Sequence, residues 1–207
     1  MTTRRWIETL ALLFVAALVW SGMAWSKAHA QRTAPDLPVL GTVPPFSLID
    51  QDGQVVTAET LRGSVWVADF IFTRCSGQCP MMQAQLAALA GEVVARPMAG
   101  SITFVSFSVD PEHDTAPVLA QYASAYTKHA GRWRFLTGER QAIVELCTKG
   151  FKLSASDEAS APESITHSSR FVLVDRQGSI RGYYDSAEAS QLQQLRRDLD
   201  RAEQDAS

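Results

Sequence analysis

The chain has 207 residues, enough for one domain of ordinary size and a targeting segment. Hydrophobic residues make up 46% and charged residues 20%, so we expect a globular protein rather than a disordered one. The formal net charge of −3, without a basic stripe, argues against a nucleic-acid-binding protein. Three cysteines are too few for a small domain held together by disulfides.

The N-terminal residues 1–26 have the pattern of an export segment. Arg4 and Arg5 precede an apolar run, and the 19 residues Ile7–Trp25 are about the number needed to cross a roughly 30 Å hydrocarbon core. The arginines favour a cytoplasmic N-terminus. Ala28–Ala30 has the A-x-A form of a cleavage site, so a retained membrane anchor and a cleaved signal peptide are both open. Both interpretations place the domain on the extracytoplasmic, periplasmic side.

Residues 27–44 are predicted to be a linker and residues 45–207 a single folded domain. The linker is rich in proline and polar residues, a composition that forms no core. Alternating or β-branched runs predict strands, and apolar residues spaced three or four apart predict helices. The expected strands are Phe46–Ile49, Val55–Thr57, Val65–Phe72, Ile102–Val109, Trp133–Leu136, Phe171–Asp175 and Ile180–Tyr184. The expected helices are a segment from Pro80 to Ala95, Asp114–Tyr126, Glu139–Lys149 and Ala187–Ala202.

This order of elements is that of an α/β protein with a thioredoxin-like fold. A strand, a cysteine-bearing turn, a helix and a second strand require parallel central strands, and the hairpin near the C-terminus adds antiparallel ones. We therefore expect a central mixed sheet flanked by helices, with an N-terminal hairpin and an N-terminal transmembrane segment.

Cys75 and Cys79 lie in the predicted turn between a buried strand and the start of a helix. Free N–H groups and the helix dipole favour a thiolate at that place, and Pro80 suits a first helical turn. Two such thiols serve either reversible disulfide chemistry or the binding of one soft metal ion. Their spacing is one residue longer than in the usual C-x-x-C redox motif, which weakens the oxidoreductase interpretation. Thiolates favour Cu(I), and an added imidazole also accommodates Cu(II).

His167 is the candidate for that imidazole. It precedes a strand whose start, in this fold, lies next to the cysteine turn. His113 follows a central strand at the same sheet edge and is a minor candidate. His29 belongs to the linker, and His129 stands beside a lysine at the end of a helical pattern, where a solvated side chain is expected.

Five other residues in these segments have simpler expected roles. Asp69 is expected to be a hydrogen-bonded polar residue within its strand, and Asp110 to cap the turn that follows its strand. Met82 fits the apolar stripe of the first helix, whereas Met81 is expected to fill space nearby. Cys147 is expected to be a buried apolar residue.

Three segments resemble, in order, the Sco/SenC family of copper chaperones. They are Val67–Met82, Val105–Thr115 and His167–Asp175. The resemblance covers roughly residues 44–200, and it places the metal ligands of the family on Cys75, Cys79 and His167. Residues 162–166 lack the aromatic residue and the aspartate expected before the histidine, a departure that bears on copper affinity and on the client.

The resemblance implies a membrane-tethered metallochaperone that delivers Cu(I) or Cu(II) to the binuclear copper centre of cytochrome c oxidase. Its implied partners are the copper-bearing oxidase subunit, other copper chaperones and the membrane, with no nucleic acid. Such a protein is a carrier rather than an enzyme, and nothing in the sequence resembles a Ser–His–Asp triad. The alternatives are a thiol–disulfide oxidoreductase acting on oxidase-subunit cysteines through the redox pair Cys75 and Cys79, and a copper or redox sensor.

Overall fold

A computed structural model describes residues 18–21, 23, 36–95, 102–127, 132–153 and 169–205. The chain divides into Met1–Asp36 and a folded body, Leu37–Ser207. Within the described ranges, no helix is long and apolar enough to cross a membrane. The predicted transmembrane segment, residues 1–26, lies almost wholly outside these ranges and stays a prediction.

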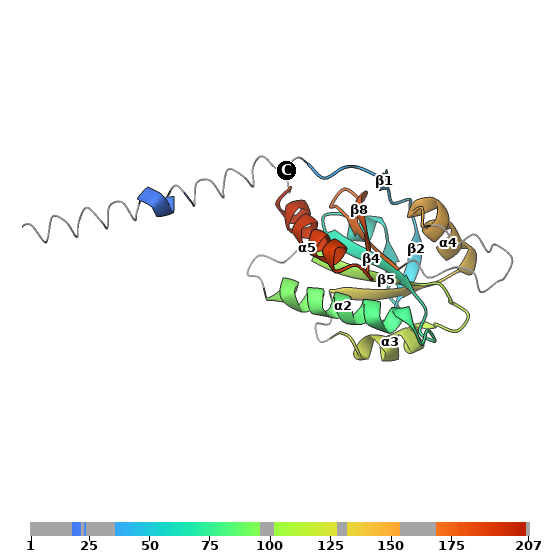
Figure 1. Cartoon of the computed structure of the whole chain (residues 1–207). Coiled ribbons are helices and arrows are strands. Elements are labelled where there is room, and N and C mark those ends of the chain that lie inside the picture. Colours follow the sequence, from blue (N-terminus) through green and yellow to red (C-terminus); the bar gives the residue numbers. More distant parts are fainter. Residues whose placement is uncertain are drawn as a thin grey trace, which may run out of the picture. The chain divides into compact units, whose positions relative to one another are not determined.

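The described part of the folded body contains one eight-stranded sheet with the order β1-β8-β7-β4-β5-β6-β2-β3 (Figure 1). Its strands are β1 (Gly41–Thr42), β2 (Ser47–Asp50), β3 (Val55–Thr57), β4 (Val65–Ile71), β5 (Ile102–Ser108), β6 (Trp133–Thr137), β7 (Arg170–Val174) and β8 (Ser179–Asp185). The central strands β4, β5 and β6 are parallel, and the other neighbouring pairs are antiparallel. The predicted mixed sheet and both predicted hairpins are confirmed.

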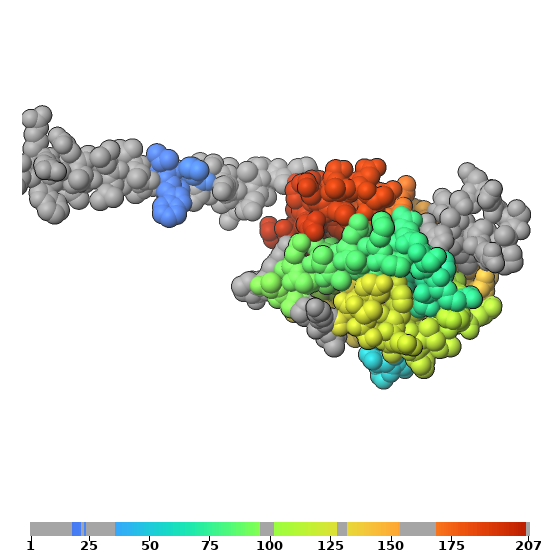
Figure 2. Space-filling view, turned by 60° about the horizontal axis from the view of Figure 1, so that its bottom comes forward, coloured from blue at the N-terminus to red at the C-terminus, as the bar shows by residue number. Residues whose placement is uncertain are grey.

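Helices cover both faces of the sheet. They are α2 (Gln78–Val94), α3 (Ala116–Ser124), α4 (Arg140–Glu145) and α5 (Ala189–Gln204), with a short 3₁₀ helix η1 (Glu59–Leu61) and a π-helical turn η2 (Leu146–Gly150). Helices α2, α3 and α5 share one core with one face of the sheet, and α4 and η2 share a second core with the other face. Figure 2 shows α2 at the surface with α3 beside it.

Strand β4 is the central element because both of its faces are buried. Val67 and Ile71 belong to the core under α2, whereas Trp66 and Phe70 belong to the core under α4. All seven β4 residues are buried, which explains why the strand is a continuous apolar run with only Asp69 as an exception.

The predicted linker enters the folded body earlier than expected. Leu37 and Val43 are buried, and β1 pairs with the outer side of β8. The Leu40 N–H donates to the Ile180 carbonyl at 2.8 Å. Residues 37–44 therefore add an edge strand, because the backbone of even two residues can pair with an open sheet edge whatever the local composition.

The predicted helix Glu139–Lys149 is present, but its second half has a different pitch. Helix α4 ends at Glu145, and a π-helical turn follows in which the Phe151 N–H donates to the Leu146 carbonyl at 2.8 Å. A Cβ atom at Gly150 would lie 2.8 Å from Cδ of Pro44, so the close approach of the N-terminal segment requires glycine there.

The packing of α2 can be tested with one substitution on each of its faces. Leu86 is fully buried, so Leu86→Ala should lower the free energy of unfolding by about 2–5 kcal/mol by leaving a cavity. Met81→Ala changes a side chain that is 62% exposed, so it should change the free energy of unfolding by less than about 0.5 kcal/mol. Urea unfolding of the full-length chain, followed by circular dichroism, measures both values. Equal losses in the two variants would contradict this packing.

Candidate metal centre

Cys75 and Cys79 occupy the junction between β4 and α2. Cys75 lies in the loop after β4 and is half-buried, whereas Cys79 is the second residue of α2 and is 1% exposed. Both are free thiols. Figure 2 shows that the start of α2 lies at the surface of the protein.

The two thiols differ in acidity. Burial acts to raise the pKa of Cys75, but N–H groups of Cys79, Gly77 and Gln78 and the thiol of Cys79 donate to its sulfur, and its pKa is lowered as a result. Burial raises the pKa of Cys79 to about 12, and the nearby Cys75 sulfur and Asp69 carboxylate add to the increase. Cys75 is therefore the more readily formed thiolate, and Cys79 is the thiol that donates to it.

The loop after β5 reaches the cysteine loop from the side. Strands β4 and β5 are parallel, with Ile71 opposite Ser108, so their loops leave the same edge of the sheet. The carboxylate of Asp110 accepts hydrogen bonds from Nε and Nη2 of Arg74 at 3.2 and 2.6 Å. Asp110 was predicted to cap the turn after its strand. It does so through its backbone carbonyl, which accepts from the N–H groups of His113 and Asp114. Its side chain pairs with Arg74 instead.

Asp110, His113 and Asp114 form a compact group in that loop. Among the described residues they are the one set of three metal-ligand types whose ligand atoms lie within 4.8 Å of one another. The carboxylate of Asp114 already accepts hydrogen bonds from Thr73, Ser108 and His113. Burial acts to raise its pKa, but these bonds outweigh burial and lower it. The group is therefore a hydrogen-bonded cluster, and the minor candidate His113 belongs to it rather than to a group with the cysteines.

A second polar network lies beneath Cys79 within the core. Asp69 is fully buried and accepts hydrogen bonds from Nε2 of Gln83 at 2.5 Å and from Oγ of Ser106 at 2.6 Å. Nε1 of Trp133 donates in turn to Ser106 at 2.9 Å. Burial raises the pKa of Asp69 to about 7, although both hydrogen bonds oppose the increase. The prediction that Asp69 is a hydrogen-bonded polar residue within its strand is confirmed.

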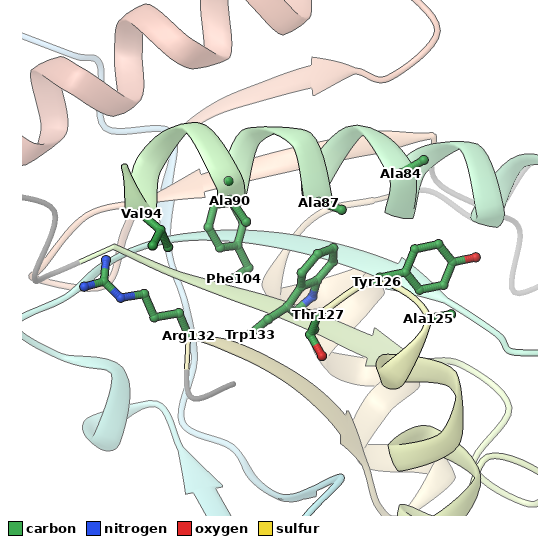
Figure 3. A pocket seen from close by; sticks show the side chains of 11 residues that line it. Ala84, Ala87, Ala90, Val94, Phe104, Ala125, Tyr126, Thr127, Arg132 and Trp133 are labelled. Carbon is green, nitrogen blue, oxygen red and sulfur yellow. The ribbon is translucent and has the colours of Figure 1, made fainter. Parts of the chain in front are cut away.

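A cavity of about 460 Å³ lies further along α2, away from the cysteines. Figure 3 shows Ala87 and Ala90 of α2 facing Phe104 and Trp133 of the sheet across it, with Tyr126 at one end. Its described lining contains neither cysteine nor histidine. This cavity therefore does not include the cysteines of the β4–α2 junction.

The structure brings together two of the three predicted ligands, Cys75 and Cys79. His167 lies outside the described residues, as do His29 and His129, so the ligand set Cys75, Cys79 and His167 stays a prediction.

Other predictions near the site had mixed outcomes. Met82 and Cys147 are buried, as predicted. The prediction for Met81 was wrong, because its side chain is 62% exposed on the outer face of α2. The sequence analysis did not predict the contacts of Asp114 with Thr73 and of Asp110 with Arg74. The sequence indicated only that acidic residues follow a strand predicted to be parallel to β4.

Comparison with known proteins gives consistent matches. The SCO1/SenC family model matches residues 38–202. The SCO1 protein homolog of Bacillus subtilis (strain 168) is 37% identical over 152 residues, which are 73% of this chain and 77% of that protein. A protein of Stutzerimonas stutzeri whose name includes the words "copper-binding protein" is 31% identical over 148 residues, 71% of each chain.

Solved structures agree with these matches. The structure of BsSco superposes with a TM-score of 0.71 at 34% identity, covering 82% of this chain and 98% of that one. BsSco is described as a member of the Sco family of cytochrome c oxidase assembly proteins, and a disulfide switch was identified in it.

The difference between the thiols predicts selective alkylation. In the reduced protein at neutral pH, iodoacetamide should modify Cys75 at least about tenfold faster than Cys79, because thiolate and exposure both favour Cys75. Cys147 is an internal control, since burial raises its pKa to about 12 and leaves it 3% exposed. Peptide mass spectrometry over time measures the three rates. Equal rates for Cys75 and Cys79 would contradict the assignment.

The buried Asp69 predicts a pH dependence of stability. Its pKa is about 7 in the folded protein against 3.8 ordinarily, so the folded state holds this proton more tightly. The resulting stabilisation is complete below about pH 4 and is lost as the pH rises through 7, a loss of up to about 4 kcal/mol. The Asp69→Asn variant should lack this component. Its new amide can donate to Oε1 of Gln83 once the Gln83 amide turns over, and that oxygen has no hydrogen-bond partner among the described residues. Urea unfolding from pH 4 to 8 compares the two slopes, and parallel curves would refute the prediction.

Proposed function

The chain belongs to the SCO1/SenC family, and from that membership we propose that it is a copper metallochaperone acting in the assembly of cytochrome c oxidase. The observation that carries the proposal is the pair Cys75 and Cys79 at the start of α2, with one thiolate stabilised by N–H groups and one thiol buried beside it. We further propose that the N-terminal segment tethers the protein to the membrane and that the folded body lies on the periplasmic side.

The two sulfurs suit copper as a cargo. Thiolates are soft ligands that select Cu(I) over harder divalent ions. A metal displaces the proton of a thiol that it binds, so the high pKa of Cys79 makes copper binding release a proton and weaken at low pH. Cys75, already stabilised as a thiolate, is the residue that first meets the ion.

His167 is proposed as the third ligand. Strand β7 runs antiparallel to β4, so its first residue, Arg170, lies toward the edge at which β4 ends. His167 stands three positions before Arg170, which limits the separation of their Cα atoms to about 11 Å. An imidazole added to two thiolates also accommodates Cu(II).

Delivery is proposed to proceed by ligand exchange. A thiolate of the client binds the ion as Cys75, the more exposed of the two cysteines, releases it; Cys79 then takes back its proton. The copper-bearing subunit of cytochrome c oxidase is the proposed client and other copper chaperones are the proposed donors. The description of BsSco as a member of a family of oxidase assembly proteins supports this choice.

The second candidate is a thiol–disulfide oxidoreductase, which the lowered pKa of Cys75 favours. Its thiolate would attack a client disulfide and form a mixed disulfide. Cys79, once deprotonated, would attack Cys75 and release the client as a dithiol, leaving this protein with a Cys75–Cys79 disulfide that a cellular dithiol must reduce. The disulfide switch identified in BsSco supports this chemistry.

Anaerobic copper titration of the reduced full-length protein tests the proposal. We expect a stoichiometric thiolate–Cu(II) absorption band and EPR signal that Cys75→Ser and Cys79→Ser abolish. His167→Ala should weaken Cu(II) binding by more than about tenfold and Cu(I) binding less, because imidazole is the harder ligand. Cys147→Ala, which changes a buried cysteine of the other core, should bind as the wild type does.

The two candidates predict different outcomes. Absence of copper binding by the wild type would overturn the metallochaperone proposal. Reduction of a model disulfide at an unchanged rate by His167→Ala would then support the oxidoreductase.

A further inference from the structure

Asp114 is a buried carboxylate with an unusual set of partners. It is 0% exposed and lies in the loop between β5 and α3. It accepts hydrogen bonds from the N–H of Thr73 at 3.0 Å and from Oγ of Thr73 at 2.5 Å. Oγ of Ser108 donates to it at 2.6 Å, and Nδ1 of His113 lies 2.9 Å away. Two of these four contacts come from a single residue of the cysteine loop.

The ordinary role of an acidic residue at this position would be to cap the helix that follows. Helix α3 begins at Ala116 with Thr115 as its N-cap, and no side chain accepts a capping hydrogen bond there. The carboxylate of Asp114 is instead directed back to the loop between β4 and α2. A buried charge is costly unless it is well paired. Because Asp114 does not cap α3, its hydrogen bonds with Thr73 must serve another purpose.

That reason is the position of Thr73, two residues before Cys75. The next residue, Arg74, pairs with Asp110 from the same loop, but its side chain is 62% exposed. An exposed ion pair is screened by solvent and contributes little. The backbone N–H of Cys75 donates to the carbonyl of Phe72 at 3.2 Å, the limit of an ordinary bond. The hydrogen bonds between Asp114 and Thr73 are shielded from solvent, unlike the ion pair of Arg74.

The sulfur of Cys75 depends on this placement. It lies in the loop that leads into α2, where the nearby backbone N–H groups of Cys79, Gly77 and Gln78 favour its thiolate. A displacement of the Cys75 backbone by a few tenths of an ångström would change the position of its sulfur relative to these groups, and interactions with N–H groups are sensitive to distance and angle.

We propose that Asp114 is a positioning residue of the dithiol site: by holding Thr73 it keeps the Cys75 sulfur against the N–H groups of α2 and beside Cys79. The role concerns the thiol pair itself and rests on the proposed function only where copper is the readout. Through this contact, the loop after β5 helps to position the cysteine in the loop after β4.

The first test uses the reduced, metal-free, full-length protein. Asp114→Asn keeps the shape of the side chain and removes its charge, and Thr73→Val removes the hydroxyl while keeping the branched shape. Each should slow the alkylation of Cys75 by iodoacetamide at pH 7 by about tenfold, because the N–H groups that favour the reactive thiolate are then less well aligned with its sulfur. Thr73→Ser keeps the hydroxyl and should restore the wild-type rate. The variant with both Asp114→Asn and Thr73→Val should be no slower than Asp114→Asn alone, because the two substitutions affect the same contact between Thr73 and Asp114.

Asp175 provides a matched control. It is buried and accepts from the N–H groups of Gln177 and Ser179 and from Nε of Arg181. It follows Val174, which pairs with Trp66 near the start of β4, at the end of the strand opposite to the cysteine loop. Asp175→Asn should lower stability in urea as Asp114→Asn does and leave the Cys75 rate unchanged.

A wild-type rate in both Asp114→Asn and Thr73→Val, or an equal slowing in Asp175→Asn, overturns the proposal. If Asp114→Asn does not fold, Thr73→Val and its Thr73→Ser rescue decide the question. Copper affinity, measured by competition titration, should fall about tenfold in Thr73→Val. A wild type that binds no copper, with the slowing of alkylation intact, removes the copper function and leaves the positioning role standing.

Discussion

The parallel pairing of β4 with β5 is the constraint on which the site depends. The pairing runs from Val65 opposite Ile102 to Ile71 opposite Ser108, and the N–H of Val109 continues it by donating to the Ile71 carbonyl at 2.8 Å. Since both strands end at the same edge, the cysteine loop and the loop containing Asp114 meet there. A shift of one residue would move every β4 side chain to the opposite core, so the burial of both faces of β4 also holds the register of the site.

The same register places a polar network in the core under α2. Asp69 lies on the same face of β4 as Val67 and Ile71 and therefore points to α2, and Gln83 of α2 and Ser106 of β5 donate to it. Buried polar groups are costly unless they are hydrogen-bonded, and this network is nearly complete. Its effect on the dithiol is electrostatic: a buried carboxyl group near Cys79 disfavours a second negative charge, which helps to separate a thiolate from a thiol that keeps its proton.

Local patterns predicted the elements well where packing and pattern agree. The apolar run that became β4 and the stripe of Met82 and Leu86 on α2 are both buried, so periodicity carried the information. Two details were not predicted where residues far along the chain contact one another. The strand Gly41–Thr42 exists because β8 offers an open edge, and the turn at Leu146–Gly150 accommodates the approach of Pro44. Neither partner is visible in the local sequence.

Short contiguous segments of the chain were enough to predict the order of strands and helices, the two cysteines at a strand–helix junction, and the family. The folded structure was needed to show which thiol is buried, which is stabilised as a thiolate, and that Asp114 holds Thr73 instead of capping its own helix. The physical reason is that burial and hydrogen bonding between distant residues depend on strand pairing. The cysteine pair was therefore predictable as a site, whereas the division of labour between Cys75 and Cys79 was not.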